Sequence, residues 1–138
     1  MSPAARPDVP RHFTSFLAFD YGAKRTGVAV GNRMLRSATP QPTIRAEGRA
    51  RLEAAEQRVR EWQPDALVVG VPFHPDGAPH ENTERARRFG RQLAARVKLE
   101  VFEVDERYST TEALSAGAAD ADAAAACIIL EQFLRSIE

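Results

Sequence analysis

The chain has 138 residues, of which 43% are hydrophobic and 28% charged, and this length and composition suit one globular domain. Its 19 basic and 19 acidic residues balance to a formal net charge of zero. Its single cysteine, Cys127, excludes a disulfide framework and a cysteine-based zinc site, and fits a reducing cytosol. No apolar run approaches the ~20 residues of a membrane span and no secretory leader precedes the first predicted strand, so we expect a cytoplasmic protein.

The two signs of charge are unevenly distributed along the chain. Residues 1–98 contain 17 Lys or Arg against 10 Asp or Glu, whereas residues 99–138 contain 2 against 9. The neutral total therefore conceals a basic part that favours an anionic partner and an acidic part that favours a cationic one. The alternative is an uneven surface that serves solubility alone.

The first part of the chain predicts a lead-in followed by strands. Residues 1–14 are rich in Pro and Ala, and we expect them to be disordered. Aromatic and β-branched residues bounded by glycine predict strands at 16–22 and 26–32, joined as a hairpin with residues 23–25 in its turn. Two prolines restrict residues 36–44 to an edge strand.

The middle of the chain predicts a helix, a strand and a second helix. Residues 46–62 carry apolar residues at helical spacing, namely Leu52, Ala55, Val59 and Trp62. Residues 66–72 form a continuous apolar run, typical of a strand covered on both faces. Residues 81–97 form the second helix, whose polar faces carry Arg85, Arg87, Arg88, Arg91 and Arg96.

The last part predicts one more strand and a closing helix. Residues 99–104 alternate between apolar and acidic side chains, which is typical of an edge strand. Ser109 or Thr110 is expected to cap a short helix, and the last helix is expected over about 121–137. An initial hairpin followed by strand–helix–strand units predicts an α/β fold over residues 15–138. We expect a mixed five-stranded sheet with helices on both faces, an order similar to the RNase H-like fold.

Three carboxylates are candidates for a metal site. Asp20 lies near the end of an apolar strand, on the face of Phe16 and Ala18, where a carboxylate is costly unless hydrogen bonds, an ion pair or a metal satisfies it. Glu106 follows a predicted strand, and Asp122 begins the last helix. From the element order we expect all three to border one end of the sheet, and such oxygen ligands suit Mg²⁺ or Mn²⁺. Each also has a plainer interpretation as a turn cap, a loop residue or a partner of the helix dipole.

Asp120 competes with Asp122 for the third position. Residues two apart on a helix differ by about 200°, so both cannot face one site. Asp122 continues the apolar stripe through Ala126 and Phe133. We therefore expect Asp122 to be the ligand and Asp120 to cap the helix N-terminus.

Four blocks follow one another along residues 15 to 137: FLAFDYGAKRTGVAVG, LVVGVPFHPDGAPHENTERARRF, VDERYSTTEA and DAAAACIILEQFL. In this order they resemble the YqgF-type family, pre-16S rRNA nucleases that are also described as Holliday junction resolvase-like. The resemblance implies an RNase H-like fold and metal-dependent phosphodiester cleavage in the cytoplasm. It also implies a part in ribosome biogenesis, the maturation of the 5′ end of 16S rRNA.

The resemblance also implies a site. The family's acidic residues correspond to Asp20 in DYG, Glu106 in DER and Asp122 in the last block, as catalytic residues and metal ligands. Asp20 is expected to bridge two Mg²⁺ or Mn²⁺ ions, with the other two carboxylates holding one or both ions. The residues expected to contact the phosphate backbone are Lys24, Arg25, Arg85, Arg88 and Arg107.

The chain departs from the family pattern after Glu106. Fifteen residues separate Glu106 from Asp122, a short segment without the basic residues that usually precede the last aspartate, which predicts a weaker grip on the substrate. The expected substrate is structured RNA, such as pre-16S rRNA, or branched DNA recognised by shape, with the protein a monomer or a homodimer. The alternatives are a Holliday junction resolvase and a catalytically weak nucleic-acid-binding module in ribosome assembly. A further alternative is a sugar-kinase or actin-like ATPase, because DYGAKRTGVAV also resembles the phosphate-binding hairpin of that superfamily. Those enzymes need two such domains around a nucleotide, and 138 residues supply one.

Overall fold

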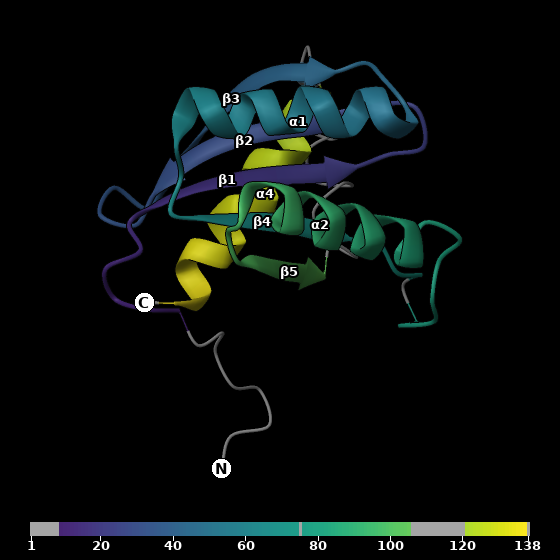
Figure 1. Ribbon diagram of the computed structural model, residues 1–138. Helices are drawn as coiled ribbons and strands as arrows, with labels where there is room; N and C mark the ends of the chain where they lie inside the picture. Colours follow the sequence, from purple (N-terminus) through teal and green to yellow (C-terminus); the bar gives the residue numbers. More distant parts are fainter. Residues whose placement is uncertain (1–8, 75, 106–120, 138) are drawn as a thin grey trace.

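The structure of the chain, a computed structural model, describes residues 9–74, 76–105 and 121–137. Figure 1 shows the arrangement of its helices and strands. In chain order these elements are β1 (Ser15–Tyr21), β2 (Thr26–Asn32), β3 (Ser37–Ile44), α1 (Gly48–Trp62), β4 (Ala66–Val71), α2 (Thr83–Val97), β5 (Val101–Asp105) and α4 (Ala121–Ser136). Within this described part, no helix is long and apolar enough to cross a membrane.

The strands form one mixed sheet in the order β3-β2-β1-β4-β5. β1 pairs antiparallel with β2, and β2 antiparallel with β3. β4 lies parallel to β1 and β5 parallel to β4, and parallel neighbours require crossover connections, which contain α1 and α2. The carboxyl ends of β1, β4 and β5 therefore lie at one edge of the sheet, the edge at which open α/β sheets usually bind ligands.

The side chains of β1 alternate between the two faces of the sheet. Phe16 and Ala18 belong to the core that α4 covers, whereas Leu17 and Phe19 belong to the core under α1 and α2. Figure 1 shows the same layers, with α1 and α2 on one side of the strands and α4 on the other. Because β1 is covered on both faces, any polar side chain near its end has to be accommodated by neighbouring backbone or by a partner.

The structure confirms the predicted fold class, a mixed five-stranded sheet with helices on both faces. The observed bounds of the predicted helices and strands lie within two residues of the expected ones. The short helix expected at Ser109 or Thr110 lies outside the described residues. So do residues 1–8 of the expected lead-in, while Val9 and Phe13 pack against the core on the α4 side.

Two positions of α1 differ from the predicted apolar stripe. Trp62 was expected in the core but is 47% exposed, because α1 ends there and Gln63 turns the chain with a left-handed φ of 45°. Arg51 lies outside the predicted stripe but is 3% exposed. Its guanidinium donates hydrogen bonds to backbone carbonyl groups, which is what allows a charged side chain to be buried.

Candidate functional site

Asp20 lies one residue before the carboxyl end of β1, between two glycines on the neighbouring strands. Its Cα partners are Gly27 on β2 and Gly70 on β4. The alternation of β1 places the partly buried Asp20 side chain on the same face as Phe16 and Ala18, toward α4. Since neither flanking position carries a side chain, the residues beside this carboxylate on both adjacent strands present backbone alone.

Gly27 allows the first turn of α4 to approach the sheet closely. A Cβ atom built on Gly27 would collide with the backbone carbonyl oxygen of Asp122. Directly paired residues point to the same face of a sheet, so the side chain of Asp20 and the first turn of α4 lie on the same side, next to the same glycine. The fold thus brings together the segments that carry two of the three predicted carboxylates.

The Asp122 carboxylate forms an ion pair with Arg25, one of the predicted phosphate contacts. The distance from Arg25 Nε to Asp122 Oδ2 is 3.1 Å, and the two side chains are 55% and 30% exposed. Together with Lys24 and two further residues of the β1–β2 turn, they line a cleft of about 470 Å³. A basic turn and a carboxylate therefore face the same open space.

A buried arginine holds the β1–β2 turn in place. Arg51 donates from Nη1 to the carbonyl oxygen of Gly22 and from Nη2 to that of Ala23, each over 2.7 Å. Its guanidinium also lies over the Tyr21 ring, 4.1 Å from the ring centroid. Burial lowers the pKa of Arg51, but a guanidinium stays protonated at neutral pH. A permanent positive charge therefore supports the turn that borders the cleft.

The carboxylates suit a hard divalent cation. Asp20 and Asp122 offer oxygen ligands, which favour Mg²⁺ or Mn²⁺ over zinc. Within the residues that the structure describes, no group of three potential ligand side chains is close enough to hold a metal. Glu106 and Arg107 lie outside those residues, and Glu106 directly follows Asp105, the last residue of β5 at the same edge of the sheet.

The remaining predicted nucleic-acid contacts, Arg85 and Arg88, lie on the opposite face of the sheet. Both are exposed on α2 and line a pocket that also includes Arg49 and Arg51 of α1. The structure thus divides the predicted phosphate contacts into a group at the cleft and a group in this pocket.

Two residues that position the site were missed by the sequence analysis. The role of Gly27 could have been predicted from the sequence, because a glycine inside a strand often marks a close approach of another backbone segment. The role of Arg51 could not, since in the sequence it is one of several arginines on an amphipathic helix.

Comparisons with known proteins identify the family. The family model described as RuvX, Holliday junction resolvase, matches residues 14–136. A relative from Polaromonas sp. (strain JS666), named "Putative pre-16S rRNA nuclease", is 71% identical over 137 residues, which cover 99% of each chain. A relative of the same name from Albidiferax ferrireducens is 69% identical over 137 residues, which cover 99% of this chain and 88% of the relative.

A comparison with solved structures supports the RNase H-like fold. T. thermophilus RuvC in complex with Holliday junction substrate has a TM-score of 0.54 at 15% identity, over 90% of this chain and 96% of that one. At this identity the likeness concerns the fold. The family model and the close relatives confirm the resemblance found in the four sequence blocks, and the chain belongs to the RuvX Holliday junction resolvase family.

Proposed function

We propose that the chain is a divalent-metal-dependent nuclease that acts in the cytoplasm on the 5′ end of pre-16S rRNA during ribosome biogenesis. The observation that carries the proposal is the approach of Asp20 and the first turn of α4 to the same glycine, Gly27, beside a basic turn. The names of the relatives at 71% and 69% identity supply the substrate.

In the proposed reaction the three carboxylates and the basic turn have separate roles. Asp20 and Asp122, with Glu106 as the third ligand, would hold Mg²⁺ or Mn²⁺. When bound, divalent ions lower the pKa of a water molecule and stabilise the charge on the phosphoryl and leaving oxygens. Lys24 and Arg25 bind phosphate oxygens and position the strand without reading its sequence. Attack of water on phosphorus breaks the bond to the 3′-oxygen, so the products are a 3′-hydroxyl and a 5′-phosphate.

An RNA fragment that spans the 5′ end of 16S rRNA tests this proposal. We expect cleavage with Mn²⁺ or Mg²⁺, none with EDTA, and none by Asp20→Asn, whose melting temperature should stay level or rise because a partly buried carboxylate has been neutralised. Asp76→Asn is the control, an exposed loop aspartate that accepts a hydrogen bond from the Ala78 N–H. An Asp20→Asn variant as active as the parent would remove Asp20 from the chemistry.

The family description makes junction resolution the second candidate function. The same preparation is therefore assayed on a four-way DNA junction. Symmetric cleavage of the junction without cleavage of the RNA would favour the resolvase. Binding of either substrate without turnover would favour the non-catalytic module.

A further inference from the structure

The α1–α2 pocket is a basic cavity of about 370 Å³ on the face of the sheet opposite α4. Tyr21 and Phe89 contribute aromatic lining. Its positive charge comes from four arginines, Arg49, Arg51, Arg85 and Arg88. Among the described residues that line it, none is a carboxylate. The lining therefore favours an anion.

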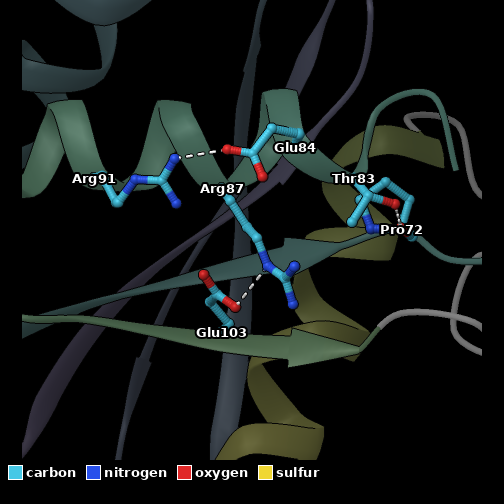
Figure 2. Close-up of polar contacts among 6 residues, drawn as sticks. All are labelled: Pro72, Thr83, Glu84, Arg87, Arg91 and Glu103. Atoms are coloured by element: carbon cyan, nitrogen blue, oxygen red, sulfur yellow. Dashed lines mark hydrogen bonds and ion pairs between the residues drawn. The ribbon is translucent and has the colours of Figure 1, made fainter. Parts of the chain in front are cut away.

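The arginines of α2 fall into two classes. Figure 2 shows Arg87 reaching from α2 to Glu103 on β5, and Arg91 pairing with Glu84 on α2 itself. These ion pairs measure 3.1 Å and 2.7 Å. In contrast, none of the ion pairs in the described part of the chain includes Arg85 or Arg88, and both line the pocket. Thus the ion pairs of Arg87 and Arg91 lie outside the pocket lining, whereas Arg88 acts on Glu84 through its charge without forming an ion pair among the described residues.

The crowded positive charge is relieved when an anion binds between the arginines. Arg85 and Arg88 lie one helical turn apart, a spacing at which like charges repel. Arg51 is 3% exposed and cannot turn toward solvent. Guanidinium groups present planar pairs of N–H donors that match the oxygens of a phosphate. The same donors match a carboxylate, and of these two anions phosphate is the one that the proposed nucleic-acid substrate carries.

Arg51 connects the pocket with the candidate active site. Arg51 is one of the residues that line the pocket, and its guanidinium holds the carbonyl groups of Gly22 and Ala23, in the turn that borders the cleft beside Asp122. A nucleic-acid strand that crosses this turn can place phosphates on both sides of it.

We propose that the α1–α2 pocket is a second phosphate-binding site, which holds the backbone of the nucleic-acid substrate away from the scissile bond. This rests on the nuclease function proposed above and adds a distinct part to its substrate-binding surface.

Two double variants of α2 that remove the same charge test the pocket. R85Q/R88Q removes the two arginines of α2 that line the pocket, and the matched control R87Q/R91Q removes the ion-paired ones. Binding of a fluorescein-labelled RNA hairpin is measured by anisotropy in EDTA at several KCl concentrations, and circular dichroism and melting curves verify that both variants are folded. We expect R85Q/R88Q to raise Kd about tenfold or more and to lower the slope of log K against log salt by about 0.7–0.9 for each lost contact. R87Q/R91Q should stay within about twofold of the parent with an unchanged slope.

The proposal is overturned if both double variants change Kd and the slope alike, or if neither changes them. Cleavage is measured separately with Mn²⁺, so the two proposals fail independently. Weaker binding by R85Q/R88Q together with an inactive parent would keep the pocket and reject the nuclease. An active parent whose Kd and kcat/KM are unchanged in R85Q/R88Q would keep the nuclease and reject the pocket.

Discussion

Arg25 places a positive charge against Asp122, with 3.1 Å between Nε and Oδ2. Because both side chains remain partly exposed, this pair contributes at most about 1 kcal/mol to stability. Its effect is therefore mainly on the site, where it places a positive charge beside the Asp122 carboxylate at the cleft. The same guanidinium lies in the cleft where a phosphate is expected, so Arg25 can exchange one anionic partner for another.

The choice between Asp122 and Asp120 is settled by two single variants. Asp122→Asn should abolish turnover and weaken Mn²⁺ binding in calorimetry, while its melting temperature falls by a few degrees at most, because the lost ion pair is exposed. We predict that Asp120, which lies outside the described residues, caps the helix, so Asp120→Asn should leave turnover nearly intact and change stability little, because asparagine caps a helix about as well as aspartate. The reverse pattern would move the third ligand to Asp120.

At the scale of elements, the contact between β2 and α4 depends on the absence of a side chain at Gly27. Gly27→Ala should destabilise the fold by about 1–3 kcal/mol and reduce turnover strongly, because the new methyl group meets backbone of α4 that has to move. Gly90→Ala is the matched control: its Cβ would lie 3.3 Å from the Cγ2 atom of the Val69 side chain, and alanine is the better helix former. Thermal unfolding and cleavage rates are compared for both. Equal losses in the two variants would show that α4 tolerates displacement at Gly27.

Asp65, the residue before β4, accepts hydrogen bonds from the start of β1 and the residue before it. The backbone N–H groups of Thr14 and Ser15 donate to its Oδ2 atom over 2.8 and 3.0 Å, and these bonds hold the pKa of Asp65 below its ordinary value. A carboxyl group with a lowered folded-state pKa stabilises the fold above its unfolded-state pKa of about 3.9, and the contribution is lost as pH falls through the folded-state value. Asp65→Asn should therefore unfold at a lower urea concentration than the parent at pH 7, with a smaller difference below about pH 4. A difference independent of pH would show that the charge of Asp65 does not matter.

At the scale of the whole molecule, the sheet could be predicted because the residue pattern of each strand depends on where that strand lies in the sheet. The two prolines of β3 placed it at an edge, and the unbroken apolar run of β4 placed it in the interior. The ion pair of Arg25 with Asp122 and the burial of Arg51 were not predictable in this way. Both join residues far apart in the sequence, and their partners become neighbours after the sheet and α4 have assembled.

We predict that a single chain carries out one cleavage. Met34 and Leu35 are 84% and 76% exposed in the β2–β3 turn, at the end of the sheet away from Asp20. Because this turn lies at the opposite end of the sheet from Asp20, a contact between two chains through it needs no residue of either cleft, and one hydrolysis requires one set of carboxylates. We therefore expect the initial rate of RNA cleavage to rise in proportion to protein concentration, and Met34→Ser with Leu35→Ser to leave kcat/KM unchanged. A rate that rises with the square of the concentration, and falls in the double variant, would mean that two chains act together, as the cutting of two strands in a junction requires.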